Sequence, residues 1–504
     1  MKPIYPFYGL TILSAFVLTC FINPVLAQEK KPNILLITID DLNDWVGYLG
    51  GHPKVKTPNM DRLAAKGVAF TNAHVQSPVC NPSRTSFLTG LRPTTTGIYG
   101  LDLWFRDMEP YKDLVTLPQY FERNGYVTMS TGKTFHDAFP PKEDRRDGPE
   151  FTKWGFHGGF LPRPEKPLVE NTGHPLIDWG VYPEHDNQQD DWKVVDWAVE
   201  QLKNPPKDKP FFLAVGIRHP HVPLFASQKW FNLYPEDDYL LPLMRGDDRD
   251  DIPPFAWYLH WNLPEPRLAW LQMHHEWKPK VRAYLASVSF ADMLVGRLLD
   301  ALEEQGLADN TIVTLLSDHG YHLGTKDITG KNTLWHESTR VPFIFSGPGV
   351  AEKGKLSDAP VELLDIFPTL NDLAGLPAKE GLDGHSLVPI LKDVNHKRLL
   401  PAICTHGPDN NAIMTEQWRF IQYADGSREL YNRKEDKYEW QNLARLDGYK
   451  SIMDELAAYL PKSAPPAPGS KTRVIEMIDG EPYWEGEKIP KDAKIPMIFM
   501  QYKR

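Results

Sequence analysis

Residues 33–41 have the sequence NILLITIDD, in which seven uncharged and mostly aliphatic residues run directly into Asp40 and Asp41. An apolar run of this length, rich in Ile and Leu, predicts a central parallel β-strand that is buried on both faces. In open α/β sheets, ligands bind at the carboxyl ends of such strands. We therefore expect the two carboxylates to lie at a functional edge of a sheet.

Two further apolar runs of the same kind lie later in the chain. Residues 210–215 (PFFLAV) come shortly before residues 218–221 (RHPH), and residues 311–317 (TIVTLLS) come directly before residues 318–320 (DHG). Three strands that deliver polar residues at the same end predict one common site.

The segments around these strands predict the rest of the fold. Amphipathic or capped patterns favour helices at residues 59–66, 283–305 and 365–374. Short runs between Gly and Asp residues from about residue 400, followed by a helix at 451–459, predict a small antiparallel sheet. The chain is thus expected to be an α/β protein whose large mixed, mostly parallel sheet is flanked by helices. The domains would be a catalytic domain at 28–399 and a smaller C-terminal α+β subdomain at 400–504. Residues 138–192, rich in Pro, Gly, Trp and His, would form a long ordered excursion over the active face.

The N-terminal segment has the pattern of a signal peptide. Lys2 is followed by an uncharged apolar stretch at 7–22 and by Val25-Leu26-Ala27 at the cleavage position. Sixteen apolar residues are few for a membrane span of roughly 20. We expect residues 1–27 to be removed and the protein to be exported, periplasmic or secreted, with no membrane contact after cleavage. An uncleaved N-terminal anchor is the alternative.

Composition excludes several classes of protein. The 504 residues are 41% hydrophobic, which rules out a disordered or fibrous chain. Asp and Glu number 66 against 56 Lys and Arg, so the net charge is −10. This balance argues against a nucleic-acid partner and against polybasic docking on a membrane. Cys20 leaves with the signal peptide, so Cys80 and Cys404 allow at most one disulfide.

Residues 80–84 (CNPSR) carry the strongest chemical signal. A Cys with Pro two residues later predicts a loop-to-helix junction, where partial positive charge and free N–H groups favour an anionic nucleophile and an anionic ligand. Arg84 lies one turn further on. The alternative is a buried structural Cys.

This segment, with Leu88-Thr89-Gly90, resembles the signature of the type I sulfatases of the alkaline-phosphatase superfamily, and most of all their iduronate-2-sulfatase branch. The resemblance covers nearly the whole mature chain. It is carried by residues 40–41 (DD), 132–136 (GKTFH), 219–221 (HPH), 317–320 (SDHG), Lys331, 430–431 (LY), 439–443 (EWQNL), 118–121 (PQYF), 124–130 (NGYVTMS), 287–289 (SVS) and 295–299 (VGRLL). After Gly324 this chain has Thr325-Lys326-Asp327 where the branch has Glu-His-Gly.

The resemblance implies an alkaline-phosphatase/sulfatase-like fold and a defined nucleophile. Cys80 would be converted to formylglycine by a formylglycine-generating maturation enzyme, and one hydroxyl of the hydrate would attack sulfur while the other later expels sulfate. Ca²⁺, with Mg²⁺ as the alternative, would be held by the modified Cys80 and by the following four residues: Asp40, Asp41, Asp318 and His319.

The resemblance also assigns roles around the sulfate. Arg84, Lys133 and Lys331 would stabilise its charge, His136 would contact the formylglycine hydroxyls, and His221 would protonate the leaving oxygen. The substrate would be a sulfated sugar, such as a 2-O-sulfated uronate of a glycosaminoglycan or an algal polysaccharide. Candidate sugar contacts are Trp104, Arg106, His219, Tyr321 and His322, although aromatic residues are more often core and His219 can be satisfied within its own turn.

Two other functions remain open from the sequence. One is a phosphatase or phosphodiesterase of the same superfamily with two zinc ions, which would use Ser or Thr where this chain has Cys80. The other is a non-enzymatic protein that binds sulfated glycans and keeps Cys80 unconverted.

Overall fold

The computed structural model describes residues 1–4, 6, 31–136, 139–140, 150–237 and 240–497. The chain divides into two units, Met1–Lys31 and Pro32–Arg504, and the second contains all the regular elements. Most of the expected signal peptide lies outside the described residues. No helix within the described ranges is long and apolar enough to cross a membrane.

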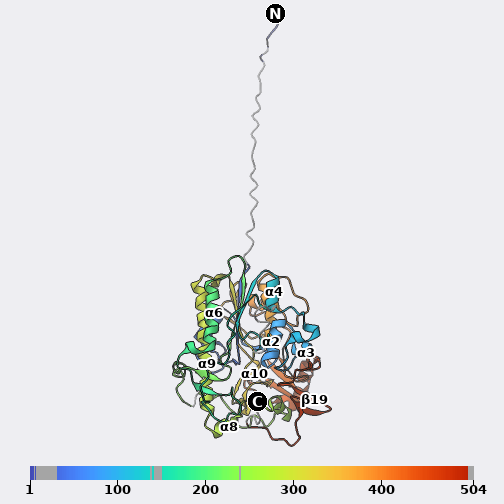
Figure 1. Ribbon diagram of the computed structural model, residues 1–504. Helices are drawn as coiled ribbons and strands as arrows, with labels where there is room; N and C mark the ends of the chain where they lie inside the picture. Colours follow the sequence, from blue (N-terminus) through green and yellow to red (C-terminus); the bar gives the residue numbers. More distant parts are fainter. Residues whose placement is uncertain (5, 7–30, 137–138, 141–149, 238–239, 498–504) are drawn as a thin grey trace. The chain divides into compact units, whose positions relative to one another are not determined.

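A twisted sheet of eight strands forms the centre of the second unit (Figure 1). Its order is β13-β2-β12-β9-β1-β7-β4-β5, in which β1 pairs in parallel with both β7 and β9 and only β12 runs antiparallel to its neighbours. This confirms the predicted mixed, mostly parallel sheet. The strands are β1 (Asn33–Ile39), β2 (Gly67–Phe70), β4 (Val127–Gly132), β5 (Lys153–Trp154), β7 (Phe211–Ile217), β9 (Thr311–Ser317), β12 (Phe343–Ser346) and β13 (Lys355–Ser357).

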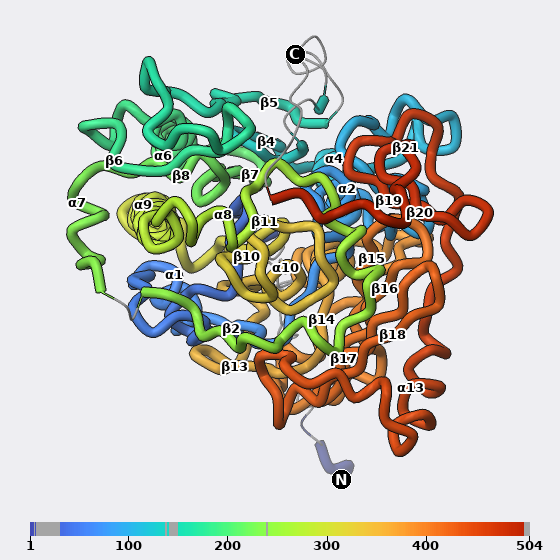
Figure 2. Tube along the Cα trace, turned by 90° about the horizontal axis from the view of Figure 1, so that it is seen from below, coloured from blue at the N-terminus to red at the C-terminus, as the bar shows by residue number. Residues whose placement is uncertain are grey.

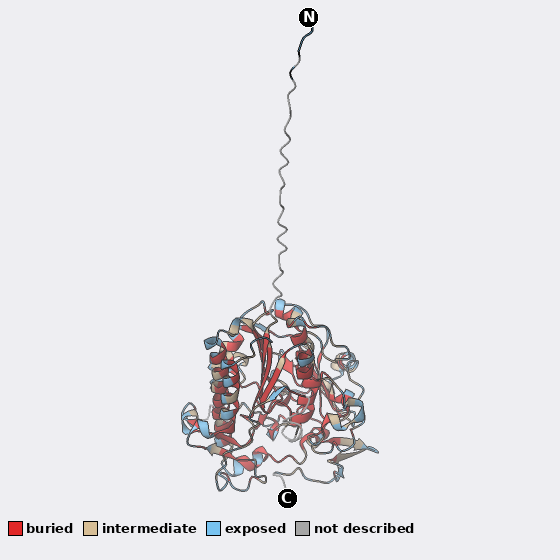
Figure 3. Cartoon of the chain, turned by 45° about the horizontal axis from the view of Figure 1, so that its top comes forward, coloured by how far each residue is buried: buried red, intermediate tan, exposed pale blue. Residues whose placement is uncertain are grey.

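Both faces of this sheet are covered, as the uninterrupted apolar strands require. Along β1, Ile34 and Leu36 belong to one hydrophobic cluster, whereas Leu35 and Ile37 belong to another, because successive side chains point to opposite faces. The first cluster includes residues of helices α2 (Cys80–Thr89), α4 (Leu117–Arg123) and α11 (Ile366–Leu373), and the second includes residues of α1 (Pro58–Ala65), α6 (Asp190–Lys203) and α9 (Trp277–Glu304). In Figure 1, α2 and α4 lie on one side of the sheet and α6 and α9 on the other. Figure 3 shows the strands as a buried layer.

The α-helices differ in length. The long α9 begins at Trp277, six residues before the predicted start of this helix at residue 283. The bounds are α1 (Pro58–Ala65), α2 (Cys80–Thr89), α3 (Pro93–Thr96), α4 (Leu117–Arg123), α6 (Asp190–Lys203), α7 (Gln228–Phe231), α8 (Leu268–Met273), α9 (Trp277–Glu304), α10 (His336–Thr339), α11 (Ile366–Leu373), α12 (Val388–Lys392) and α13 (Lys450–Ala457).

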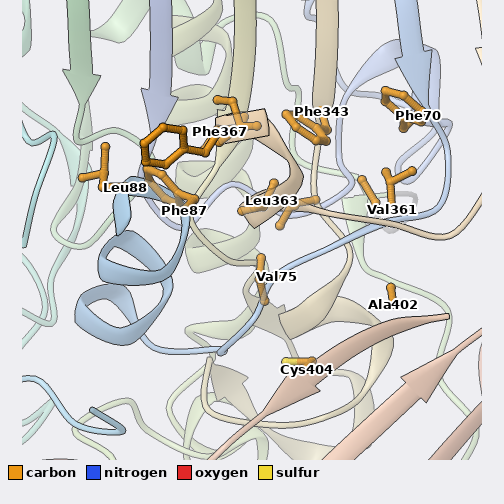
Figure 4. Packing of buried hydrophobic residues seen from close by; sticks show 14 of the residues in the cluster. Phe70, Val75, Phe87, Leu88, Phe343, Val361, Leu363, Phe367, Ala402 and Cys404 are labelled. Atoms are coloured by element: carbon orange, nitrogen blue, oxygen red, sulfur yellow. The ribbon is translucent and has the colours of Figure 1, made fainter. Parts of the chain in front are cut away.

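The C-terminal region contains the predicted antiparallel sheet, of four strands, and a smaller three-stranded sheet that the sequence pattern did not predict. Their strands are β15 (Ala402–Thr405), β16 (Asn411–Met414), β17 (Trp418–Gln422), β18 (Arg428–Asn432), β19 (Ile475–Ile478), β20 (Glu481–Trp484) and β21 (Glu487–Lys488). Cys404 and Ala402 of β15 belong to the same hydrophobic cluster as Phe87 of α2 and Val75 (Figure 4). The C-terminal region therefore shares a core with the main sheet, and Cys80 and Cys404 are both free thiols.

Short paired strands complete the fold around the carboxyl ends of the main sheet. Within the excursion predicted at 138–192, the described residues contain β5 and one strand of the β6–β8 pair. In the view of Figure 2, the β10–β11 hairpin lies between α9 and the C-terminal sheets. The bounds are β3 (Ala73–His74), β6 (Trp179–Val181), β8 (Leu224–Ala226), β10 (His322–Leu323), β11 (Thr329–Gly330) and β14 (Val361–Glu362).

Candidate active site

Four neighbouring strands of the main sheet end in polar residues at one edge. Asp40 and Asp41 follow β1, Asp318 follows β9, Lys133 follows β4, and residues 218–221 follow β7. Since these four strands are parallel and adjacent, their carboxyl ends converge. The structure thus brings together residues that lie up to about 290 positions apart in the chain.

Cys80 is the first residue of α2 and is 2% exposed. Its Sγ lies 3.1 Å from Nε2 of His319 and 3.2 Å from Nζ of Lys331. Burial alone would raise the pKa of the Cys80 thiol, but Lys133, Lys331 and His319 together hold it well below its ordinary value. The position therefore stabilises negative charge, as a nucleophile requires.

Three cations surround the two carboxylates of the β1 loop. Nζ of Lys133 lies 2.5 Å from Asp40 Oδ2, and Nζ of Lys331 lies 2.7 Å from Asp41 Oδ1. Nη2 of Arg84 lies 3.4 Å from Asp40 Oδ1. These ion pairs are buried, so the positive and negative charges of the site compensate one another locally.

Arg84 makes more hydrogen bonds to other residues of the protein than its expected role as a sulfate contact would require. Its Nε donates to Asp318 Oδ2 at 2.8 Å, and its Nη1 donates to the carbonyls of Lys133 and Thr134. The residue is fully buried. These contacts favour a role in holding Asp40 and Asp318 in place over direct contact with an external anion.

The ligand atoms of four residues lie within 4.8 Å of one another: Asp40, Asp41, Cys80 and His319. Asp41 has a left-handed backbone (φ 62°), and its Oδ2 is buried without a hydrogen-bond partner among the described residues. A buried carboxylate oxygen without a partner is unfavourable unless a cation or donor occupies the space beside it. The four residues offer two carboxylates, one imidazole and one thiol, and carboxylates are the ligands that a hard divalent cation prefers.

Asp318 lies at the margin of this cluster. Its Oδ1 accepts hydrogen bonds from the backbone N–H groups of Asp41 and His319, and its Oδ2 lies 3.7 Å from His319 Nε2. The carboxylate therefore connects the β9 loop to the β1 loop in addition to facing the cluster.

The two histidines after β7 have different surroundings. Nε2 of His221 lies 3.9 Å from Asp41 Oδ2, and its Nδ1 faces the carbonyl of Val222 at 2.6 Å. His221 thus presents one ring nitrogen to the cluster. His219 is 2.6 Å from Asp191 Oδ2 through Nδ1 and 3.0 Å from the carbonyl of Phe225 through Nε2. Both ring nitrogens of His219 already have partners, so the expected sugar contact of His219 is not supported.

Two further residues assigned by resemblance have distinct positions. His136 packs against Phe139 with a ring-centroid distance of 6.3 Å, and its buried Nδ1 has no hydrogen-bond partner within the described ranges. Lys331 keeps its place beside Cys80 although the chain differs from the branch at 325–327. There Lys326 turns inward and donates to Asp248 Oδ1 and to the carbonyl of Glu439, each at 2.7 Å.

Three of the other residues expected to contact the sugar have their side chains held by contacts within the protein. Trp104 is 2% exposed and stacks on Phe139 at 5.3 Å. Arg106 is paired with Glu150 and donates to Gln119. Both nitrogens of the buried His322 face threonine hydroxyls, and burial lowers the pKa of His322 to about 3, which keeps the ring neutral. A sugar-binding role for Trp104, Arg106 or His322 is therefore not supported.

Tyr321, the remaining candidate, is buried and stacks on Tyr284 at 5.7 Å, but its hydroxyl has no hydrogen-bond partner in the described part of the chain. Sequence reasoning missed Tyr284, whose hydroxyl donates to the Asp41 carbonyl, and Asp191, which holds His219. It also missed Lys280, a buried lysine of α9. The sequence signal for Lys280 is the helical periodicity of α9, which places this lysine at a buried position.

A cavity of about 720 Å³ lies beside this cluster. Its lining includes Asp44, His336, Arg340 and Arg433 but none of the residues whose ligand atoms converge. It therefore does not mark the reacting centre.

The mixed sheet, Cys80 at a helix N-terminus and the carboxylate cluster at the strand ends fit a hydrolase of the alkaline-phosphatase-like class. Comparison with known families agrees. The "Sulfatase" family matches residues 32–376, and the C-terminal region of N-sulphoglucosamine sulphohydrolase matches residues 324–464. The chain belongs to the sulfatase family and is a sulfuric ester hydrolase, which sets aside the phosphatase alternative.

Several known proteins are similar to this chain over most of their own length. A "Sulfatase" of Formosa agariphila is 43% identical, covering 86% of this chain and 87% of that protein. Human iduronate 2-sulfatase is 34% identical, covering 68% of this chain and 69% of that protein. The solved structure of a 2-O GAG sulfatase superposes with a TM-score of 0.67 at 23% identity, covering 85% of this chain and 91% of that one, and supports the fold.

Proposed function

We propose that this sulfatase hydrolyses a sulfate ester on a uronate-containing sugar, with a 2-O-sulfated uronate of a glycosaminoglycan or algal polysaccharide as the substrate. The observation that carries the mechanism is the convergence of Cys80, Asp41, His319 and Lys331 within hydrogen-bond range. The similarity to human iduronate 2-sulfatase supports the choice of sugar.

Cys80 would first be converted to formylglycine by a separate maturation enzyme, so an oxygen would take the place that Sγ has here. The hydrate would carry two hydroxyls. One oxygen attacks sulfur as the bond from sulfur to the sugar oxygen breaks, leaving a sulfated residue 80. The second hydroxyl then loses its proton, the carbon–oxygen bond to sulfate breaks, and the aldehyde returns for rehydration.

Asp40, Asp41, Asp318 and His319 would hold the divalent cation, for which we propose Ca²⁺ with Mg²⁺ as the alternative. A bound cation would lower the pKa of the attacking hydroxyl and offset the charge of the sulfate.

The remaining polar residues would handle charge and protons. Lys133 and Lys331, which face the carboxylates here, would share their positive charge with the sulfate, and Arg84 would keep Asp40 and Asp318 in position. His221 would protonate the leaving sugar oxygen from Nε2, because its Nδ1 already faces the carbonyl of Val222. His136 would contact the formylglycine hydroxyls.

The proposal includes export, since the N-terminal 27 residues have the pattern of a signal peptide. Export would bring the enzyme into contact with polysaccharide in the periplasm or outside the cell.

The mechanism is tested by the mass of residue 80 together with sulfate release. Protein produced with an active maturation enzyme should show replacement of the Cys80 –CH₂SH group by an aldehyde and should release sulfate from a 2-O-sulfated uronate. Protein produced without that enzyme should keep the thiol and be inactive. Equal activity of the two preparations would contradict the formylglycine mechanism. Full conversion without sulfate release from sugar or aryl sulfates would favour the glycan-binding alternative.

Removal of divalent cations tests the cluster. Chelation should abolish sulfate release and lower the melting temperature, because a cation that binds the folded protein and not the unfolded chain stabilises the fold. Ca²⁺ or Mg²⁺ should restore both properties better than Zn²⁺. Restoration by Zn²⁺ alone would contradict the assignment of a hard cation.

A further inference from the structure

The aromatic ring of Phe160 lies against His221, the residue proposed to protonate the leaving oxygen. The centroids of the two rings are 5.3 Å apart, and the rings are tilted by 37°. Phe160 belongs to the excursion that the sequence predicted over the active face, whereas His221 follows β7. Both residues line one small hollow. The excursion therefore brings a side chain into direct contact with the site.

The polar contacts of the His221 ring are made at its edge. Nδ1 faces the carbonyl of Val222 at 2.6 Å, and Nε2 lies 3.9 Å from Asp41 Oδ2. Since a carbonyl only accepts hydrogen bonds, Nδ1 carries a proton, and Nε2 is the nitrogen that can exchange a proton with a substrate. A hydrogen bond at one edge leaves an imidazole able to swing, and packing by a neighbouring ring restricts this motion.

Two guanidinium groups hold the Phe160 ring in turn. The central carbons of Arg218 and Arg163 lie 5.4 Å and 5.9 Å from its centroid. The electron-rich face of an aromatic ring attracts such cations. Nε of Arg163 also donates to the carbonyl of Phe160 at 3.3 Å, and the hydroxyl of Tyr182 donates to the carbonyl of Arg163 at 3.0 Å. The ring against His221 is thus itself restrained.

The backbone on both sides of Phe160 is attached to the main fold. Before it, the N–H of Gly155 donates to the carbonyl of Ser130 in β4 at 2.7 Å. After it, the N–H of Asp190, the first residue of α6, donates to the carbonyl of Leu161 at 3.0 Å. Both β4 and α6 contact β7, the strand that leads to His221. One framework therefore sets the positions of Phe160 and His221.

We infer that Phe160 is a positioning residue for His221: its ring keeps the imidazole turned so that Nε2 points at the scissile oxygen of the substrate. This inference rests on the proposed role of His221 as the acid. The side chain of Phe160 has no donor or acceptor, so it acts through His221 and not on the sulfate. The part of the excursion around Phe160 thus completes the leaving-group side of the site.

The test compares a sugar sulfate with an activated aryl sulfate, whose phenolate leaves without protonation. Phe160→Ala should lower kcat on the sugar sulfate by about 10-fold or more, because a misplaced acid loses part of its contribution. On the aryl sulfate, kcat should stay within about 2-fold of wild type. KM for both substrates should change little. Phe160→Tyr, which keeps the ring, should restore the wild-type ratio of the two rates.

A double-mutant cycle separates positioning from direct contact with the sugar. In the His221→Ala background, Phe160→Ala should change kcat on the sugar sulfate by less than about 2-fold, because the group that it positions is already absent. The same loss in both backgrounds, or a loss confined to KM, would overturn the inference. Equal losses of Phe160→Ala on the two substrates would also overturn it.

Phe156→Ala is the matched control. Phe156 lies in the same segment and is 40% exposed, but its ring faces Lys193, with Nζ at 5.6 Å from the centroid. This variant should keep the wild-type ratio of rates, and melting curves should show that all variants fold. A Phe156→Ala variant with the same selective loss as Phe160→Ala would overturn the inference. Failure of the wild-type enzyme to cleave any sulfate ester would instead overturn the proposed function, and the inference with it.

Discussion

At the scale of single residues, the environment of Cys80 matches its proposed chemistry. Its Sγ lies within 3.2 Å of two potential donors, Lys331 and His319, and the surrounding cations lower the pKa of the thiol despite burial. Cys404 has the opposite environment: burial raises the pKa of its thiol well above the ordinary value, and the residue packs in the hydrophobic core (Figure 4). The neighbours of the two cysteines thus have opposite effects: those of Cys80 favour the thiolate, and the apolar surroundings of Cys404 disfavour it.

Cys80→Ala should abolish sulfate release while the protein stays folded. The side chain lies among polar groups rather than in the core, so its loss removes the nucleophile without opening an apolar cavity. Cys404→Ala is the matched control and should retain full turnover per folded molecule. Sulfate release and circular dichroism on both variants check this. Turnover by Cys80→Ala near the wild-type rate would contradict a nucleophile at residue 80.

His221→Ala should slow hydrolysis of a sugar sulfate by roughly 10²–10⁴-fold and that of an activated aryl sulfate far less, because a phenolate leaves without protonation. Lys331→Ala should slow both substrates by comparable factors, since its charge acts on the sulfate. The ratio of the two rates in each variant is the measurement, so differences in folded fraction cancel. Equal losses for His221→Ala on both substrates would exclude it as the acid.

At the scale of elements, the site depends on how closely β7 packs against β4. Gly216 of β7 pairs with Gly132, and the N–H of Lys133 donates to the Gly216 carbonyl at 3.0 Å. A Cβ on Gly216 would come within 2.1 Å of the Lys133 backbone. The absence of a side chain at this one strand position therefore allows Lys133 to reach Asp40.

Gly216→Ala should destabilise the protein by about 1–3 kcal/mol, because backbone atoms must move to admit the methyl group. It should also lower kcat by displacing Lys133. Gly448→Ala is the control: a Cβ there meets no atom within 4 Å, so neither stability nor kcat should change. Urea unfolding and steady-state kinetics on the two variants provide the test. A Gly216→Ala variant as stable and active as wild type would contradict this packing argument.

At the scale of the whole molecule, buried charges connect the C-terminal sheet to the active-site half. Arg419 of β17 donates to the Leu334 carbonyl and to the hydroxyl of Thr339 in α10, and its Nε lies 2.6 Å from Glu439. Arg433 lies 3.3 Å from the same carboxylate. The segment between Lys331 and α10 is thus held in place by polar contacts with residues near positions 419–439, in addition to the shared hydrophobic core.

Glu439→Gln should reduce stability at pH 7 by about 3 kcal/mol, because Arg419 loses its charged partner. Burial opposes ionisation of Glu439, but Arg419 and Arg433 outweigh it and lower its pKa from 4.5 to about 2. Because the pKa of Glu439 is lower in the folded than in the unfolded state, ionisation of Glu439 stabilises the fold at every pH above the unfolded-state pKa. The difference between wild type and variant should therefore be constant above about pH 5 and shrink as the pH falls from about 4.5 toward 2.

Melting temperatures of wild type and Glu439→Gln between pH 3.5 and 7 check this, since other titrating groups are common to both proteins. The exposed Asp454, which pairs with Lys450 at 2.8 Å, supplies the control Asp454→Asn with little change in melting temperature. A difference for Glu439→Gln that stays constant down to pH 3.5 would contradict the ion-pair assignment.

Much of this protein could be predicted from local patterns in its sequence. The bounds of β1 and β9 match the predicted runs, because a strand buried on both faces leaves a continuous apolar signature. The strands β15–β18 were likewise predicted by alternation and turn residues. The family was recognisable because residues 80–84 form a short contiguous motif, and the family match over residues 32–376 confirms it.

The sequence by itself thus determined the strand–helix framework, the sulfatase family and the sheet edge at which polar residues follow the strands. The tertiary structure alone decided which charged groups pair. Arg84 lies against Asp318, Arg106 lies against Glu150, and Lys280 lies among aromatic rings with no hydrogen-bond partner among the described residues. The physical reason is that backbone structure follows from neighbours within a few residues, whereas a charge acts on whatever the fold brings close to it. Glu150 is 44 positions from Arg106 and Asp318 is 234 positions from Arg84, and no local periodicity records either pairing.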